Sequence, residues 1–168
     1  MEQNRYMANH NVDILIIGAG PAGLYGAYYA GFRGMSVALM DSLEEPGGQI
    51  TAMYPEKAIF DVGGFPAIKG KDLIENLLNQ AKPYNPKFLL NQTATTLTKN
   101  PDKSVTITSE TDSVTAKAVI ITGGIGKFTP RPLPAADGWS GKGLVHFVPK
   151  LSEHQGKDVV IVGGGDSA

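Results

Sequence analysis

An apolar run over residues 12–17, interrupted only by Asp13, is the first strong feature of the hydrophobic pattern. A run without polar alternation is typical of a strand that is buried on both faces of a parallel sheet. Small and apolar residues over 21–33 then predict a helix packed closely on that strand, with Gly34 as its end. Residues 36–40 predict a second strand, so that the three segments form one βαβ unit.

The pattern beyond this unit predicts a loop, a helix and a group of strands. Glycine and proline recur over residues 42–69, which predicts a long loop of the kind that usually carries function. Residues 72–81 place their leucines on one helical face before Pro83. From Lys87 to Thr122 we expect a meander of strands at 88–98, 104–109 and 114–122. The pattern therefore predicts an α/β fold with a parallel sheet and a β-meander.

Composition excludes several kinds of protein. The chain has 168 residues, no cysteine and a net charge of -1, with 42% hydrophobic residues. Without thiols it has no disulfide framework and no cysteine-ligated metal, and the balanced charge argues against disorder or a nucleic-acid binder. The length suggests about one domain. No charge lies between Asp13 and Arg33, but the glycines and Pro21 there argue against a membrane span, and no export signal precedes them.

A β-run that ends in a glycine turn occurs twice. The first turn contains Gly18, Gly20, Pro21, Ala22 and Gly23, and the second is Gly163-Gly164-Gly165 after the apolar residues 159–162. In dinucleotide-binding folds the first glycine makes a tight turn, the second lets the backbone approach a pyrophosphate, and a small third residue lets the helix pack on the strand. The phosphate then lies at the positive end of the helix.

A carboxylate supports the first turn as a nucleotide site. Asp41 ends the second predicted strand, near the expected spacing of about 20 residues, where it would accept a hydrogen bond from a ribose hydroxyl. A solvated strand-end acid remains the alternative for Asp41. An ordinary turn remains the alternative at Gly163 and Gly165, because the sequence stops at Ala168 before a helix and an acidic partner can be read.

With these motifs the sequence resembles the two-dinucleotide-binding flavoproteins, specifically the thioredoxin-reductase-like type of ferredoxin–NADP reductase. The resemblance runs from about residue 12 to the end, and its matching pieces are Gly18-Ala19-Gly20-Pro21-Ala22-Gly23, Gly47-Gly48-Gln49, Tyr54-Pro55-Glu56-Lys57, Gly64-Phe65-Pro66, Phe128-Thr129-Pro130-Arg131 and the second glycine turn. It implies a Rossmann-like, three-layer FAD/NAD(P)-binding fold. The Tyr54 to Lys57 stretch is the most specific to this reductase type.

The resemblance also implies roles for individual residues. The first turn would bind the ADP half of FAD and the second would bind NADPH. Asp41 would bind the adenosine ribose, while Gly48 and Gln49 would lie by the flavin side. Tyr54 would lie against the isoalloxazine ring, where stacking is favourable. Ala94, in a strand over residues 91–95, would touch the adenine and Phe128 would line the FAD site, although from the residues alone core packing is favoured for both.

The same resemblance implies a domain division and a reaction. Residues 1–125 would form an incomplete FAD-binding domain, and residues 126–168 the connection to and the start of an NADPH-binding domain, so that we expect an N-terminal fragment. Electrons would pass from NADPH through FAD to ferredoxin or a similar small carrier in a cytoplasmic homodimer. FAD would supply the chemistry, so no catalytic side chain is expected, and the histidines His10, His146 and His154 form no spaced metal cluster.

Two alternatives to this reductase stay open. A thioredoxin reductase would need a Cys-x-x-Cys pair shortly before the second turn, and residues 142–150 contain no cysteine. The chain could also be a FAD-binding module without catalytic activity.

Basic residues outnumber acidic ones over residues 117–157, which would help to steer an acidic ferredoxin, although a solvated surface explains them equally well.

Overall fold

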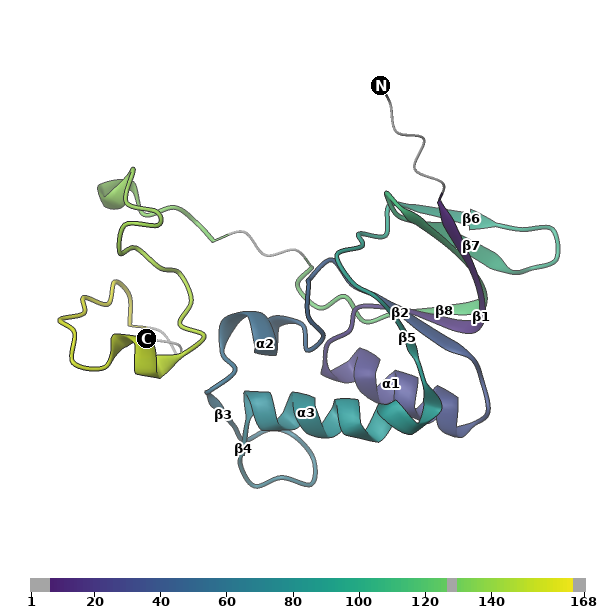
Figure 1. Ribbon diagram of the computed structural model, residues 1–168, viewed down its shortest axis with the longest axis horizontal. Coiled ribbons are helices and arrows are strands. Elements are labelled where there is room, and N and C mark those ends of the chain that lie inside the picture. Colours follow the sequence, from purple (N-terminus) through teal and green to yellow (C-terminus); the bar gives the residue numbers. More distant parts are fainter. Residues whose placement is uncertain (1–6, 127–129, 165–168) are drawn as a thin grey trace.

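A six-stranded sheet forms the centre of the protein in the computed structural model, which describes residues 7–126 and 130–164 (Figure 1). The strand order is β5-β2-β1-β8-β7-β6. The first four strands of that order are parallel: β5 (Lys87–Leu89), β2 (Val37–Met40), β1 (Ala8–Ile17) and β8 (Asp112–Ile121). The antiparallel strands β7 (Val105–Thr108) and β6 (Thr96–Lys99) continue the sheet from β8.

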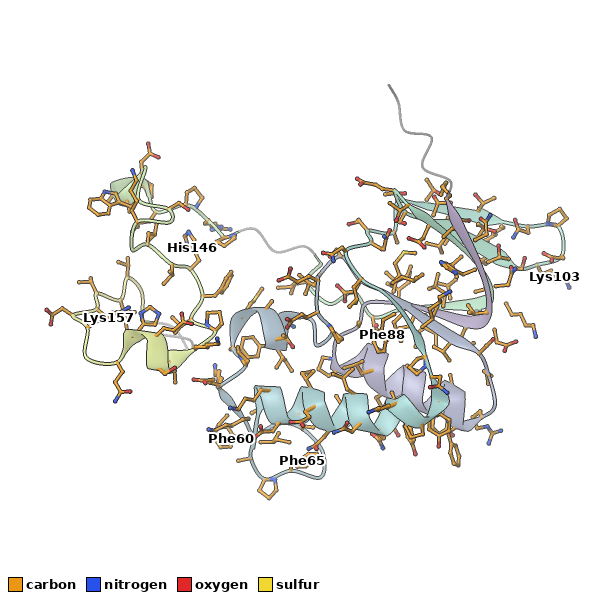
Figure 2. All side chains as sticks on the ribbon, in the orientation of Figure 1. Phe60, Phe65, Phe88, Lys103, His146 and Lys157 are labelled. Atoms are coloured by element: carbon orange, nitrogen blue, oxygen red, sulfur yellow. The ribbon has the colours of Figure 1, made fainter. Side chains whose placement is uncertain are left out.

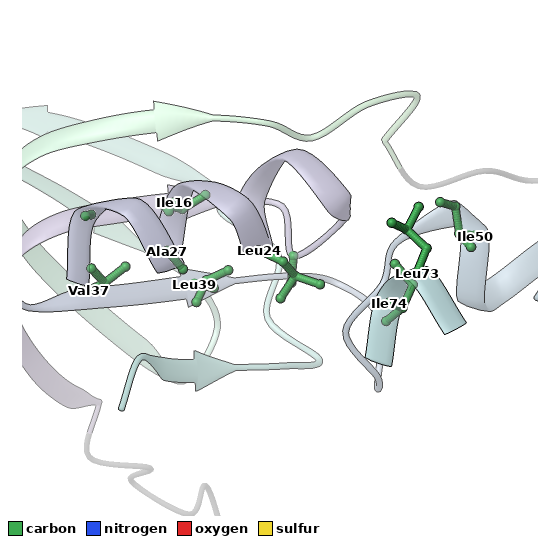
Figure 3. Close-up of a cluster of buried hydrophobic side chains, with 10 residues drawn as sticks. Ile16, Leu24, Ala27, Val37, Leu39, Ile50, Leu73 and Ile74 are labelled. Carbon is green, nitrogen blue, oxygen red and sulfur yellow. The ribbon is translucent and has the colours of Figure 1, made fainter. Parts of the chain in front are cut away.

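Helices cover one face of the parallel strands. Helix α1 (Pro21–Phe32) lies beside α3 (Gly70–Ala81), which continues into the 3-10 turn η1 (Lys82–Tyr84) (Figure 1). Ile16 and Leu39 of the sheet pack with Leu24 of α1 and Leu73 of α3 in one hydrophobic core (Figure 3). The hydrophobic face of 72–81 predicted this helix, and the structure confirms it.

The opposite face of the sheet carries a second core. Leu15 and Met40 from the parallel strands pack with Ile107 of β7 and Val114 of β8. Because Leu15 and Ile16 are neighbours on β1 and both are fully buried, the strand is covered on both faces, as its unbroken apolar run predicts. Helices, parallel strands and the antiparallel meander together give the expected three-layer α/β arrangement.

The long loop predicted over residues 42–69 contains short elements. These are the helix α2 (Gln49–Met53) and the strands β3 (Ala58–Ile59) and β4 (Ile68–Lys69), which pair with each other in a small antiparallel sheet. Proline and glycine keep each of them short. Strand β1 also begins earlier than predicted, because its polar first residues pair with β8, a long-range contact that leaves no hydrophobic pattern.

The prediction of one strand over residues 88–98 is wrong. The chain forms β5 at one edge of the sheet, crosses to the other edge, and forms β6 there. Asn91 at φ 55 turns the chain after β5. Ala94 therefore lies in the connection between the two strands and not in a strand, and its side chain packs against the second core.

The strand predicted before the second glycine turn does not form either. Residues 157–164 carry no regular structure, and the side chain of Val160 is 88% exposed. A parallel strand needs a neighbour for its hydrogen bonds, and no described strand lies beside this run. The preceding segment holds only the short 3-10 turns η2 (Pro134–Ala136) and η3 (Leu151–His154). Within residues 7–126 and 130–164, no helix has the length and hydrophobicity needed to cross a bilayer.

Candidate functional site

The outer glycines of the first turn stand where no side chain fits. Gly18 has φ +105, and a Cβ there would lie 2.5 Å from the carbonyl oxygen of Thr122. A Cβ at Gly23 would lie 1.9 Å from the carbonyl oxygen of Gly18. These two glycines therefore let the turn pack tightly between β1 and α1.

The middle glycine faces open space instead. A Cβ at Gly20 would meet only the Cα of Gly48, at 3.9 Å. Gly20 is also the N-cap of α1, with Pro21 in the first turn, no side-chain cap and no acidic residue there. The first N–H groups of a helix lack partners within it, and they attract an anion. The geometry of this turn suits the close approach of a phosphate group.

Asp41 fixes the turn from the end of β2. Its side chain is 9% exposed, and Oδ2 accepts a hydrogen bond from the Ala19 N–H at 2.6 Å, while Oδ1 accepts one from the Leu43 N–H at 2.9 Å. A carboxylate has about four acceptor positions, so a ribose hydroxyl can still donate to it. Asp41 is thus not the solvated strand-end acid of the alternative interpretation, and it holds the glycine turn in place.

A second glycine pair touches the first turn. The Gly47 N–H donates to the carbonyl of Ala19 at 2.8 Å. Gly48 has φ +61, and a Cβ there would come within 3.0 Å of the Cα of Gly20. The chain then enters α2 at Gln49, whose side chain is exposed. Tyr54 ends that helix half-buried against the helix-side core, so its ring is partly used in packing.

A cavity of about 320 Å³ lies beside Gly48. Its volume is at the lower end of the range for small-molecule sites. Its lining residues are Leu43, Glu44, Glu45, Gly48, Thr51, Ala52 and Pro149. Pro149 comes from the C-terminal segment, which is also tied to this region by the hydrogen bond from the Leu151 N–H to the Glu56 carboxylate at 3.0 Å.

The connection that carries Ala94 also reaches the site. The Gln92 N–H donates to the carbonyl of Asp41 at 2.8 Å, and the Asn91 N–H donates to that of Leu43 at 2.9 Å. The structure therefore gathers the first glycine turn, Asp41 and Gly48 through direct contacts, with Gln49 and the Ala94 connection next to them along the chain. Gly163 is not part of this group of contacts, because a Cβ added there would meet nothing within 4 Å. Phe128 and Gly165 lie outside the described residues.

Thr122 is a site residue that sequence analysis missed. Its hydroxyl donates to the carbonyl oxygens of Ile17 and Gly18 at 3.1 and 2.9 Å, and it lies 2.9 Å from where a Cβ of Gly23 would be. It therefore contacts both outer glycines. Its place at the end of the last predicted strand, just before Gly123, is the signal in the sequence that could have identified it.

A polar cluster lies outside this site, where β1 and β8 begin. The His10 ring bonds Asp112 through Nε2 at 2.7 Å and the Lys87 ammonium through Nδ1 at 2.7 Å. Burial raises the pKa of the Asp112 carboxyl, but hydrogen bonds from Thr111 and His10 outweigh it and leave that pKa below its ordinary value. Over the described part of the chain, no three His, Asp or Glu side chains gather as a metal site requires.

Comparisons with known proteins agree on one family. Residues 12–168 match the model of the pyridine nucleotide-disulphide oxidoreductase family. The ferredoxin–NADP reductase of Saccharopolyspora erythraea is 59% identical over 157 residues, covering 94% of this chain and 48% of that protein. The ferredoxin–NADP reductase of Frankia alni is 62% identical over 155 residues, covering 92% and 48%. The chain thus spans about half the length of the curated relatives it matches.

Solved structures with the same architecture include two thioredoxin reductases. The thioredoxin reductase of T. acidophilum has a TM-score of 0.63 and 30% identity, over 80% of this chain and 42% of its own. The thioredoxin reductase of Streptococcus pyogenes has a TM-score of 0.61 and 28% identity, over 76% and 39%. Most of the length of this chain therefore has the same fold as part of each of these two enzymes.

Proposed function

The chain belongs to the pyridine nucleotide-disulphide oxidoreductase family, and from this membership we propose that it forms part of a flavoprotein that transfers electrons between NADPH and ferredoxin through FAD. The relatives at 59% and 62% identity carry the name ferredoxin–NADP reductase, and they support this proposal. The observation that carries it is the geometry of the first glycine turn. Gly18 and Gly23 leave no room for a side chain, Gly20 faces open space, and the Asp41 carboxylate accepts a hydrogen bond from the Ala19 N–H.

This turn fits the pyrophosphate of FAD. The N–H groups at the start of α1 would hold the phosphates beside Gly20 and Ala22, with Pro21 fixing the first helical residue. Asp41 would accept from the adenosine ribose through its remaining lone pairs, and Ala94 would lie by the adenine. Gly48, Gln49 and Tyr54 would follow the cofactor toward the flavin.

The remaining assignments complete the proposal. Residues 1–125 would belong to the FAD-binding domain and residues 126–168 to the connection and the start of the NADPH-binding domain. Phe128 would contact FAD, and Gly163 and Gly165 would contact NADPH. The protein would act in the cytoplasm as a homodimer.

FAD, when bound, supplies the link between a two-electron donor and a one-electron acceptor. The residues of this chain would bind and orient the cofactor. The glycine turn would fix the position of the phosphates, and the half-buried Tyr54 would limit where the flavin can lie. No side chain has to act as acid, base or nucleophile.

The central experiment uses the natural protein with FAD bound. We expect NADPH to reduce a ferredoxin in its presence, which is followed by the ferredoxin absorbance. Gly20→Val should remove bound FAD, because its side chain would fill the space beside Gly20, and the protein should be colourless. The control is Glu110→Gln, an exposed residue in the turn between β7 and β8, and it should keep the yellow colour. A wild-type protein that binds FAD but does not reduce ferredoxin would contradict the proposed reaction.

A disulfide reductase is the competing function, because two thioredoxin reductases share the fold. The 168 residues contain no cysteine, including the stretch 142–150 where the dithiol would lie. We therefore expect no NADPH-dependent reduction of thioredoxin. Turnover of thioredoxin at a rate comparable to that of ferredoxin would favour the competitor.

Basic residues of the C-terminal segment offer a contact for an acidic ferredoxin. Lys142 and Lys157 are exposed there, while Lys103 lies on the hairpin at the far end of the molecule (Figure 2). Reversing Lys142 and Lys157 to Glu should raise the KM for ferredoxin several-fold at low salt, and much less at high salt. Lys103→Glu is the control. An unchanged KM for ferredoxin at low salt would show that Lys142 and Lys157 do not take part in docking.

A further inference from the structure

A lysine, a histidine and an aspartate form a chain of hydrogen bonds at the end of the sheet opposite the glycine turn. Lys87 is the first residue of β5, Asp112 is the first residue of β8, and His10 of β1 bonds to both. The His10 ring lies 2.7 Å from the Lys87 Nζ and 2.7 Å from an Asp112 carboxylate oxygen. These contacts are separate from the candidate cofactor site, because the glycine turn follows the last residue of β1.

The lysine determines the protonation state of the histidine. An ammonium group has donors and no acceptor, so Nδ1 of His10 accepts from Lys87 and carries no proton. The ring proton then lies on Nε2, which donates to Asp112 Oδ1. His10 is therefore held as a neutral ring with a basic nitrogen directed at an amine.

Burial and a further hydrogen bond fix the ring, while the amine stays accessible. The side chains of His10 and Asp112 are only 12% and 13% exposed. The second carboxylate oxygen of Asp112 accepts from the Thr111 hydroxyl at 2.7 Å. Lys87 is exposed on β5, which is an edge strand of the sheet. A nucleophile, a base in contact with it and a group that orients the base are the parts that activate a side chain for covalent chemistry.

Lys117 shows that a short contact alone does not prepare a lysine for attack. Its ammonium lies 2.6 Å from the Asp13 carboxylate, and this hydrogen bond raises the pKa of Lys117. The carboxylate favours the charged amine, which has no lone pair. The neutral imidazole beside Lys87 instead places no opposite charge against the amine, and it can take up a proton.

We propose that Lys87 is a modification site at which the amine is acylated by a thioester, with His10 as the base. The neutral amine, formed when the ammonium loses a proton to water, keeps one N–H on Nδ1 and attacks the thioester carbonyl carbon with its lone pair. As the C–N bond forms, Nδ1 accepts that N–H proton, and Asp112 stabilises the resulting imidazolium. The C–S bond then breaks, and the leaving thiolate takes the proton from the imidazolium.

An exposed amine of this kind suits an acyl group that is already activated. Attack on an ordinary amide depends on a site that stabilises the oxyanion, whereas a thioester carries a leaving group that departs readily. Acylation would remove the positive charge of Lys87 and leave one N–H for His10. This inference goes beyond the proposed function and does not depend on it.

The test treats the natural protein with a small thioester, N,S-diacetylcysteamine, and follows individual lysines by peptide mass spectrometry. Lys87 should be acetylated roughly tenfold faster than Lys99, which is exposed in β6 at the other edge of the sheet. The difference from Lys117 should be larger, because Asp13 keeps that amine charged. Lys99 and Lys117 thus serve as references within the same molecule.

His10→Gln is the matched variant, because its amide can still donate to Asp112 but its oxygen cannot act as a base. It should lower the rate at Lys87 to that at Lys99 and keep the far-UV circular dichroism of wild type. The charged groups that face His10 are Lys87 from β5 and Asp112 from β8. From pH about 5 to about 9, the logarithm of the rate at Lys87 should rise with a slope of two and then of one, because both the amine and His10 must lose a proton. At Lys99, and at Lys87 in His10→Gln, the slope should be one throughout.

Asp112 is a positioning residue, since it acts through His10. Asp112→Asn should lower the rate at Lys87 several-fold and keep the two slopes, because His10 remains the base. A Lys87 that reacts no faster than Lys99, equal rates in wild type and His10→Gln, or a single slope at Lys87 in wild type would each overturn the proposal. Fast acetylation of Lys87 in a protein that does not reduce ferredoxin would contradict only the proposed function.

Discussion

Thr122 shows how a single hydroxyl can organise the first glycine turn. Its hydroxyl donates to the carbonyl oxygens of Ile17 and Gly18, where the turn begins. Gly18 is 104 residues away along the chain. Because both carbonyls accept from the same hydroxyl, the end of β1 and the first residue of the turn keep a fixed orientation. The hydroxyl is engaged with the backbone, so Thr122 acts as a positioning residue for the turn.

Removing this hydroxyl should weaken cofactor binding. Thr122→Val keeps the shape and removes the hydroxyl that donates to the Gly18 carbonyl, which costs about 1–3 kcal/mol if that oxygen stays buried, whereas the Ile17 carbonyl keeps its bond from the Thr122 N–H. We expect FAD binding to weaken roughly tenfold, measured by flavin fluorescence on titration. Thr122→Ser restores the donor and should bind FAD like wild type. Equal losses in both variants would show that the methyl group matters instead.

At the scale of elements, the packing of α1 against η1 depends on Gly31. A Cβ there would lie 2.4 Å from the Cβ of Tyr84, an atom that cannot move without the backbone. Gly31→Ala should therefore destabilise the fold by about 1–3 kcal/mol through overpacking, despite its better helix propensity. Gly26→Ala on the same helix is the matched control, because its Cβ would meet only the terminal Cδ1 of the Ile16 side chain, at 3.3 Å. Urea unfolding measures both, and equal stability of the two variants would contradict this account.

The start of β2 is held to its neighbours by Asp13. Hydrogen bonds from Lys117 and Ser36 hold the pKa of the Asp13 carboxyl far below its ordinary value of 3.8. Its contribution to stability is thus present above pH about 4 and is lost as the pH falls below that value. Asp13→Asn should lower the unfolding midpoint in urea at pH 7 and make it less sensitive to acid between pH about 4 and about 2. High salt should reduce the difference, because the Lys117 side chain is 81% exposed.

Sequence patterns predicted the elements whose neighbours are close along the chain. The unbroken run at 12–17 and the small residues after Pro21 identified β1 and α1, because both faces of the strand are buried and the helix packs against it. The path after β5 could not be read, since the turn at Asn91 carries the chain to the other edge of the sheet without a change in hydrophobic pattern. Asp41 was identified as an acceptor, but its bond to the Ala19 N–H depends on three-dimensional contact and leaves no mark in the sequence.

At the scale of the whole molecule, residues 130–164 differ from the layered part. They carry only two short 3-10 turns, and most of their side chains are exposed. Exposed segments with few packed contacts open at little cost in free energy. In the 168-residue chain, trypsin should therefore cut first at Lys142, Lys150 or Lys157, and later at Lys87 and Lys117, which lie in strands. Mass spectrometry identifies the fragments, and early cleavage within β5 or β8 would contradict this order.

The central place of β1 in the sheet also sets the order in which the protein can assemble during synthesis. β1 can pair with β2 soon after both leave the ribosome, but its other partner begins far later, since His10 and Asp112 are 102 residues apart. At about 5–20 residues per second, roughly 5–20 s pass before β8 is made. During that time one edge of β1 has no partner, and the glycine turn has no Thr122 to hold it. The glycine turn would therefore be one of the last parts of the fold to take shape, and under the proposed function a nascent chain could bind FAD only after β8 had joined the sheet.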